Sequence, residues 1–305
     1  MVILVACQEK PAQAPVASMP IPVVTVSQPI EKEVVEWDEF TGRTEAVKTV
    51  EVRARAKGYL NKVLFKDGSR VNKGDLLYLI DPKPYEAELT KAKAELNQVL
   101  TRKELAANDL ERAGRLLRAQ AISKEEYDSR NKGLKEMQAS VASANASVAI
   151  AQIYLEYSTV RAPISGRIGR TLITEGNLVN GSGTQETLLT YIVSTDPIYV
   201  YLDADEPSVL KYRKLAEQGR RKSARSSKIV CELGLADEQG FPHVGYIDYV
   251  EPRADPGTGT VRARAVFANP DEYLSPGFFA RVRIPGSDRY KALLIKEQAV
   301  GTDQN

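Results

Sequence analysis

The sequence has 305 residues, enough for two or three domains of ordinary size. Hydrophobic residues make up 43% of it and charged residues 27%, which is typical of a folded globular protein and not of a disordered or membrane-spanning one. The formal net charge of only +2 gives no reason to expect a polyanionic partner such as a nucleic acid.

The N-terminus reads MVILVACQEK, so that a short apolar run leads into Cys7. This pattern resembles the end of a bacterial lipoprotein signal peptide, in which the cysteine becomes the lipidated first residue. We therefore expect residues 1–22 to be a signal remnant, with lipid on Cys7, followed by a flexible tether rich in Pro and Ala. The alternative is a chance apolar start with an unmodified cysteine.

Short β-strands are expected from Val23 to Ile80, with turns near Pro29 and Thr41-Gly42. Residues 52–72, VRARAKGYLNKVLFKDGSRVN, are echoed by residues 160–180, VRAPISGRIGRTLITEGNLVN. The two copies share glycines at 58/166 and 68/176 and valines at 71/179, and glycine suits turns that need positive φ. The echo predicts two halves of one β module, with the intervening chain inserted between them.

The insertion, residues 82–157, has a helical period. A helix is expected to begin at Asp81-Pro82, and a second at Ser123, where Glu126 completes a capping box. Heptad spacing gives eight apolar or aromatic positions out of nine in each arm, at 89, 92, 96, 99, 103, 106, 110, 113 and 117, and at 127, 130, 134, 137, 141, 144, 148, 151 and 155. The sequence therefore predicts a two-helix coiled-coil hairpin of about 35 residues in each arm, about 50 Å long.

From Tyr191 onward the sequence indicates a small antiparallel barrel, interrupted by one helix over residues 207–219. Residues 211–228 hold eight Lys or Arg against one Glu, which we interpret as a solvated face, with binding to anionic lipid headgroups or nucleic acid as the alternatives. Cys231 is predicted to be a buried apolar residue, and His243 to lie alone in a turn. The sequence thus predicts no catalytic site, metal site or cofactor, and no enzyme.

Two related β segments flanking a hairpin, followed by a barrel, resemble the periplasmic adaptor subunits (membrane fusion proteins of the HlyD/AcrA/MexE type) of RND multidrug efflux pumps. The likeness is carried by VEWDEFTGRTEAVKTVEVRARAKGYL, DGSRVNKGDLLYLIDPKPYEAEL, YSTVRAPISGRIG, DPGTGTVRARAVFANPD and LSPGFFARVRIP. It implies an elongated, modular and mainly β fold. The expected parts are a split lipoyl-like (barrel-sandwich hybrid) domain (49–81, 158–187), a hairpin (82–157), a β-barrel (34–48, 188–290) and an incomplete membrane-proximal domain (23–33, 291–305).

The resemblance also implies a function. Such an adaptor joins a proton-driven inner-membrane RND transporter to a TolC-like outer-membrane channel, and it forms trimers or hexamers in the pump. It would lie in the periplasm of a Gram-negative bacterium, held to the inner membrane by its lipid. The family docks its hairpin tip onto the channel through an Arg, a Leu and a Ser, which here correspond to Arg112, Leu116 and Ser123.

Two other functions fit parts of this pattern. Lipoyl and biotinyl carrier domains share the repeated β module, but the nearest lysine to the junction, Lys83, is expected to open a helix. Adaptors of type I protein secretion usually begin with a transmembrane helix and carry a longer hairpin, which the start at Cys7 and the hairpin length do not favour.

Overall fold

The computed structural model describes residues 26–181, 186–224, 226–297 and 300. The described residues form two compact units, one from residues 26–35 and the described residues after 287, and the other from those between 36 and 287. In the described part of the smaller unit, β1 (Ile30–Val34) pairs antiparallel with β16 (Tyr290–Leu294), so that Ile30 lies opposite Leu294. The ends of the described chain thereby share one two-stranded ribbon.

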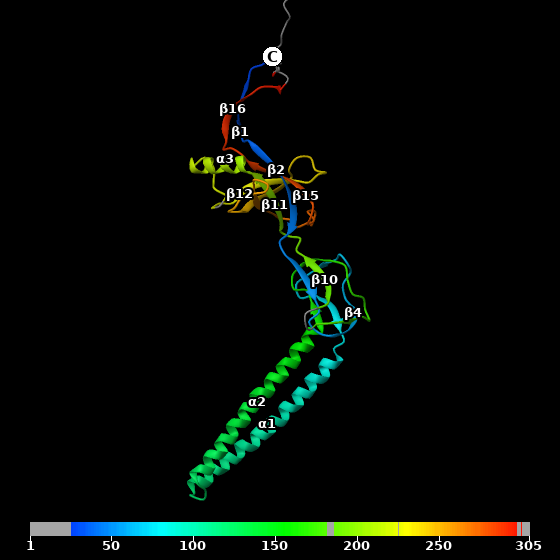
Figure 1. Ribbon diagram of the computed structural model, residues 1–305, viewed down its shortest axis with the longest axis vertical. Coiled ribbons are helices and arrows are strands. Elements are labelled where there is room, and N and C mark those ends of the chain that lie inside the picture. Colours follow the sequence, from blue (N-terminus) through cyan, green and yellow to red (C-terminus); the bar gives the residue numbers. More distant parts are fainter. Residues whose placement is uncertain (1–25, 182–185, 225, 298–299, 301–305) are drawn as a thin grey trace, which may run out of the picture. The chain divides into compact units, whose positions relative to one another are not determined.

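A closed six-stranded barrel forms one part of the larger unit (Figure 1). Its strand order is β11 (Ile198–Asp205), β14 (Thr260–Phe267), β13 (His243–Val250), β12 (Ile229–Gly234), β15 (Phe279–Pro285) and β2 (Trp37–Ala46). Alternate residues point inward, as the pleat requires, and Val200, Leu233 and Phe267 are fully buried there. Helix α3 (Glu206–Glu217) follows β11, and the Asp205 carboxylate caps it by accepting from the Ser208 amide.

Two four-stranded sheets form a sandwich next along the chain. One has the order β3 (Thr49–Arg53), β10 (Leu188–Val193), β8 (Gly166–Ile168) and β5 (Arg70–Val71). The other has the order β7 (Thr159–Arg161), β6 (Leu76–Ile80), β4 (Gly58–Val63) and β9 (Leu178–Val179).

The two copies of the repeated segment are cross-paired in this sandwich. The start of the first copy pairs with the end of the second, Gly58 with Val179, while Val71 pairs with Gly166. Gly68 and Gly176 occupy equivalent turns with φ of 73° and 84°, a region that side chains with a Cβ resist. The prediction that the echo marks two halves of one module is confirmed.

Two details of the predicted β regions are wrong. Residues 188–193 were expected in the barrel, but β10 pairs with β3 and β8 of the sandwich. Gly42 marks no turn, because β2 continues through it. A Cβ on Gly42 would lie 2.5 Å from the Tyr201 carbonyl oxygen, so the glycine permits a close approach of two strands.

Helices α1 (Lys83–Arg118) and α2 (Lys124–Tyr157) form the predicted hairpin, with 36 and 34 residues (Figure 1). Every predicted seam position is buried or half-buried except Arg130, which is exposed and lies 3.6 Å from Glu126. The start of α1 differs from the prediction: Pro82 is the N-cap, and Asp81 only accepts a 3.3 Å bond from the Lys83 amide. With its barrel, sandwich and hairpin, the chain has the predicted mainly β fold class.

Candidate functional site: the tip of the helical hairpin

The hairpin turns through residues 119–123 in a geometry fixed by backbone hydrogen bonds. Ala121 N–H donates to the Leu116 carbonyl at 2.9 Å and Gln120 N–H to the Leu117 carbonyl at 3.0 Å. Gln120 has φ of 58°, the left-handed conformation that a Schellman helix end requires. The end of α1 is therefore closed by its own backbone and does not depend on a partner.

The first turn of α2 is capped as predicted at Ser123, whose hydroxyl oxygen accepts a 3.1 Å bond from the Glu126 amide. The reciprocal half of the predicted capping box differs, because the Glu126 carboxylate lies near Arg130 instead. Ser123 is exposed, and its hydroxyl donates no hydrogen bond to another described residue.

All three residues singled out at the tip are exposed. Arg112 and Leu116 are four residues apart on α1 and so share one helix face, and Leu116 is 41% exposed. An exposed leucine, with an exposed arginine one helical turn before it and the serine that caps α2 across the turn, is arranged for contact with another surface. Docking through Arg112, Leu116 and Ser123 stays a prediction, because no partner is present.

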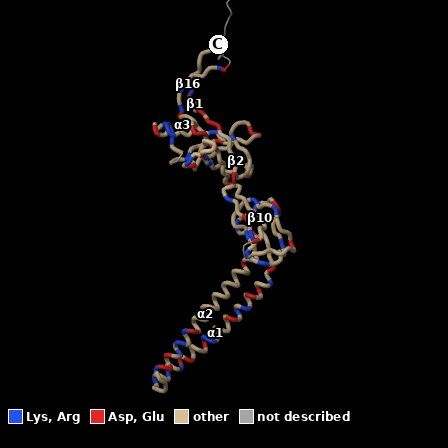
Figure 2. Tube along the Cα trace, in the orientation of Figure 1, with Lys and Arg blue, Asp and Glu red and all other residues tan. Residues whose placement is uncertain are grey.

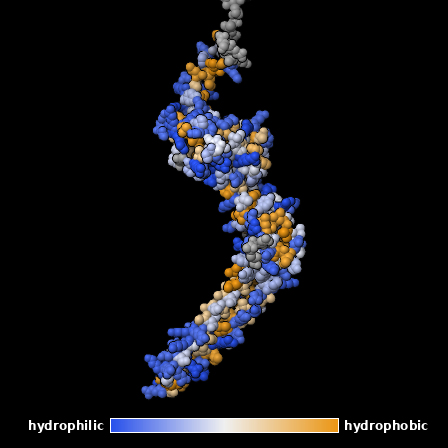
Figure 3. All heavy atoms as spheres, viewed as in Figure 1, coloured by the Kyte–Doolittle hydropathy of each residue, from blue (hydrophilic) through white to orange (hydrophobic). Residues whose placement is uncertain are grey.

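The rest of the hairpin carries more apolar surface than its own seam uses. Charged residues of both signs occur along α1 and in the part of α2 near the tip, whereas residues 137–155 of α2 carry no charge (Figure 2). Apolar patches appear on the hairpin and on the sandwich (Figure 3). The exposed apolar side chains of the hairpin are Leu100, Leu105, Leu116, Ile150, Ile153 and Tyr154. A hairpin that exposes such residues gains by packing against further helices.

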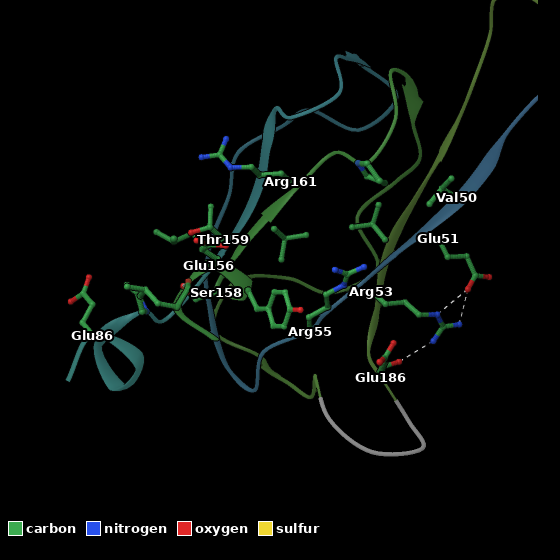
Figure 4. Close-up of a pocket in the computed structure, with 17 residues that line it drawn as sticks. Val50, Glu51, Arg53, Arg55, Glu86, Glu156, Ser158, Thr159, Arg161 and Glu186 are labelled. Carbon is green, nitrogen blue, oxygen red and sulfur yellow. Dashed lines mark hydrogen bonds and ion pairs between the residues drawn. The ribbon is translucent and has the colours of Figure 1, made fainter. Parts of the chain in front are cut away.

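A cavity of about 920 Å³ lies at the root of the hairpin, between the edge strands β3 and β7 of the two sheets (Figure 4). Arg53 is held there by the Glu51 carboxylate at 2.7 Å and donates to the Glu186 carbonyl at 2.9 Å. Arg55 lies over the Tyr157 ring at 5.5 Å. Side chains of both charge signs along two sheet edges are more typical of a protein–protein contact than of a catalytic site.

A second polar cluster, which the sequence did not indicate, joins the barrel to the sandwich. Glu272, in the loop between β14 and β15, accepts from Arg167 of β8 at 2.7 Å and from the Thr195 hydroxyl at 2.9 Å. Its side chain is only 10% exposed, and the hydrogen bond from Arg167 lowers the pKa of the carboxyl group. The only signal in the sequence was the segment DPGTGTVRARAVFANPD, which ends one residue before it.

The predicted basic face is not uniformly solvated. Lys211 pairs with Asp38 at 3.3 Å, Lys228 lies over the Tyr246 ring, and Arg221 is half-buried against the Tyr212 ring at 3.8 Å. The prediction of a solvated run is thus wrong for Arg221, because aromatic rings beneath the loop attract these cations.

The two residues predicted to have no catalytic role lie in the barrel. Cys231 is fully buried, as predicted, and burial raises the pKa of its thiol to about 12. His243 opens β13 and does not lie in a turn; its Nε2 is 2.8 Å from Glu238. Across the described residues, no group of His, Cys, Asp and Glu is arranged to hold a metal ion.

Cys7 and its tether lie outside the described residues. Within the described ranges, no helix has the length and apolar character needed to span a bilayer. Lys83, the residue considered for a carrier function, is the first residue of α1 and does not lie on a tight turn between the two halves.

Comparison with known proteins agrees with this architecture. Residues 48–191 match the family described as "RND MFP, barrel-sandwich hybrid domain", and residues 197–287 match "RND MFPs, beta-barrel domain". The chain is 40% identical over 301 residues to the antibiotic efflux pump periplasmic linker protein ArpA of Pseudomonas putida, which covers 99% of this chain and 76% of ArpA. It is 36% identical over 299 residues to the multidrug efflux pump subunit AcrA of Escherichia coli K12, covering 97% of this chain and 74% of AcrA.

A solved structure shares the fold at lower sequence similarity. The MacA-MexA chimeric protein with the Pseudomonas aeruginosa MexA α-hairpin domain matches with a TM-score of 0.60 and 23% identity, over 87% of this chain and 85% of the chimera. Together with the two domain matches and the identity to efflux pump linkers, this establishes that the chain belongs to the RND membrane fusion proteins, the periplasmic adaptor family of RND efflux pumps.

Proposed function

We propose that this chain is the non-enzymatic periplasmic linker of a tripartite pump, joining a proton-driven RND transporter of the inner membrane to a TolC-like channel of the outer membrane. The observation that carries the proposal is the rigid, exposed tip of a two-helix hairpin in a protein of the adaptor family. Relatives over nearly the whole chain are named as efflux pump linkers, which supports the same role here.

Docking to the channel would use the tip. The Arg112 guanidinium presents several N–H donors to carbonyl or carboxylate oxygens at the end of a channel helix. Leu116 would fill a groove between two such helices, and the Ser123 hydroxyl would donate a hydrogen bond. Because the turn is closed by its own backbone, docking would order few additional groups and so lose little conformational entropy.

Aspartate substitutions test this role in cells that lack another adaptor and express the cognate transporter and channel. Leu116→Asp and Ser123→Asp should each abolish drug resistance, measured as the minimal inhibitory concentration. Ser123→Asp is informative because aspartate is itself a good N-cap, so the α2 terminus stays stable while the tip gains a negative charge. Unchanged resistance in both variants would contradict docking through the tip.

Leu105→Asp is the matched control. Leu105 is 62% exposed, lies on the same face of α1 as Leu116 and is about three turns closer to the root. Resistance should fall much less in this variant. An equal loss would assign the function to the whole apolar face and not to the tip. Circular dichroism and immunoblots of membrane fractions should show all three variants folded and correctly located.

We further infer a lipid anchor on Cys7 and self-association of the adaptor at the inner membrane. Cys7→Ser in the full gene should release the protein from the membrane fraction, and persistent membrane association would contradict lipidation. Self-association is supported by the two sheet edges beside the root cavity and by the exposed apolar side chains of the hairpin. Chemical crosslinking in the periplasm should give a ladder of oligomers, and crosslinking that yields only monomer would contradict it.

A further inference from the structure

The hairpin is joined to the sandwich by two short connections that lie side by side. Strand β6 ends at Ile80 and α1 begins at Lys83. On the return, α2 ends at Tyr157 and β7 begins at Thr159. Because β6 and β7 pair with each other, the two connections are neighbours. Two neighbouring connections define an axis of rotation, so a contact away from that axis is needed to hold the hairpin in one orientation.

Tyr85, in the first turn of α1, makes such a contact with Lys57. The Tyr85 hydroxyl donates to the Lys57 carbonyl at 2.7 Å and accepts from the Lys57 amide at 3.0 Å. One hydroxyl thereby pairs with both backbone polar groups of the residue before β4. Among the described residues, these are the only hydrogen bonds between the hairpin and any part of the sandwich other than the two connections.

The segment that Tyr85 binds is anchored in the sandwich core. Ala54 and Ala56 are 0% and 2% exposed, and they belong to the core cluster of the sandwich. The Ala54 amide also donates to the Thr187 carbonyl at 2.9 Å. Because this segment is held from its buried side, hydrogen bonds to it restrain α1 and do not simply move with α1.

Aromatic packing orients the Tyr85 hydroxyl. The Tyr85 ring is half-buried against the sandwich core and stacks with Tyr154 of α2, with centroids 6.5 Å apart and an interplanar angle of 16°. The Tyr154 ring meets the Tyr157 ring edge-on at 6.3 Å, and Arg55 lies over Tyr157 at 5.5 Å. Stacked and edge-on rings have preferred geometries, so the cluster fixes the direction in which the Tyr85 hydroxyl points.

The length of the hairpin magnifies any movement at its root. With 36 residues, α1 extends about 50 Å from the sandwich. At that length, a rotation of about 10° at the root would move the tip by roughly 9 Å, which is close to the distance between the axes of two packed helices. A side chain at the tip would then face the wrong groove of a partner.

We propose that Tyr85 is a positioning residue, whose two hydrogen bonds to Lys57 hold the hairpin in one orientation on the sandwich. They thereby determine where the tip residues Arg112, Leu116 and Ser123 lie. The functional part of this proposal rests on the proposed docking through the tip. Tyr85 acts through those three residues and not by its own contact with the channel.

Pulsed electron paramagnetic resonance on the purified full chain tests the restraint. One spin label is placed near the tip, at the exposed Lys124→Cys. The second is placed at Asn61→Cys on β4 or at Arg170→Cys after β8, which are exposed positions associated with different sheets. A swing toward either sheet therefore changes at least one of the two distances. A Cys7→Ser background removes the other thiol outside the barrel.

Tyr85→Phe should widen the distance distributions by several ångströms, because it removes the hydroxyl and retains the ring. Its Tm should remain close to that of the parent, since the aromatic packing is kept. Unchanged distributions would overturn the proposal. A lower Tm with unchanged distributions would assign Tyr85 a purely structural role.

Tyr154→Phe is the matched control. It removes a hydroxyl from the neighbouring ring of the same cluster, and that hydroxyl makes no hydrogen bond to another described residue. Its distance distributions should match those of the parent. Equal widening in Tyr154→Phe and Tyr85→Phe would assign the effect to ring packing and refute the role of the Lys57 hydrogen bonds.

Drug resistance in cells tests whether the orientation serves docking. At equal protein level, Tyr85→Phe should lower the minimal inhibitory concentration and Tyr154→Phe should not. Wider distributions with unchanged resistance would refute the link between orientation and docking. That result differs from a failure of docking itself, which Leu116→Asp tests without any change at the root.

Discussion

Glu272 accepts two hydrogen bonds from Arg167, from Nη2 at 2.7 Å and from Nε at 3.2 Å. The pair joins a loop of the barrel to strand β8 of the sandwich, and Thr195, in the segment that connects the two, donates to the other carboxylate oxygen. Asn269 strengthens the same junction by donating to the carbonyls of Thr195 and Leu274, at 2.8 Å each. One nearly buried carboxylate thus fixes the connection between two β domains.

The pH dependence of the stability of the fold should reflect the ionisation of Glu272. Hydrogen bonding from Arg167 places the folded-state pKa of Glu272 below its ordinary value of 4.5. Ionised Glu272 therefore stabilises the fold above about pH 4.5, and this contribution is lost as the pH falls through the folded-state pKa. Glu272→Gln should cost about 1–2 kcal/mol at neutral pH and flatten the decline of Tm in acid. The exposed neighbour gives the control Asp271→Asn, which should retain the wild-type profile.

Gly42→Ala should destabilise the barrel. The new methyl group would lie 2.5 Å from the Tyr201 carbonyl oxygen, and two paired strands would have to move apart. Overpacking of this kind costs about 1–3 kcal/mol, which differential scanning calorimetry would detect as a lower transition temperature. A variant as stable as the parent would mean that β2 and β11 can separate without cost.

Gly133→Ala should have the opposite effect. Gly133 lies inside α2, its φ is not left-handed, and a Cβ there would meet open space. Replacing glycine by alanine in a helix interior stabilises it by about 0.5–1 kcal/mol. Slower amide hydrogen exchange along α2 is the expected observation, and faster exchange would show that the glycine is needed for helix packing.

Thiol labelling should show that Cys231 is inaccessible in the folded barrel. Cys231 is fully buried and its thiol pKa is raised to about 12, so thiolate is scarce at neutral pH. Mass spectrometry after maleimide treatment of the native protein should find Cys231 unmodified, and modified after denaturation. Rapid labelling of native Cys231 would indicate that the barrel opens readily.

The parts of the fold that were predictable from sequence are those with local periodicity. The hairpin seam from Leu89 to Leu155 is buried or half-buried at every expected position except Arg130, since a heptad pattern leaves few alternatives. The repeated glycines at 68 and 176 also predicted equivalent turns, because both adopt the positive φ that glycine readily permits. In each case, residues close in sequence determine the conformation.

Features that depend on residues distant in sequence were not predictable. Strand β10 looks like the start of the barrel because its apolar run continues toward β11, but its partners are β3 and β8. Arg221 lies among many basic residues, and only the folded chain brings it against Tyr212 and the barrel wall. The role of Glu272 was likewise not predictable, because its hydrogen-bond partner Arg167 lies in another domain.

The root of the hairpin has a consequence for the order of folding. Strands β6 and β7 lie at opposite ends of the inserted segment, yet they pair directly, and the Ile80 amide donates to the Ser158 carbonyl at 2.8 Å. Closing so long a loop from an unfolded chain would cost considerable entropy. Helix pairing, which depends on short-range contacts at the turn, can bring these ends together first. The paired helices would then hold the two halves of the sandwich close together. Only a small part of the conformational search would remain before the two sheets form.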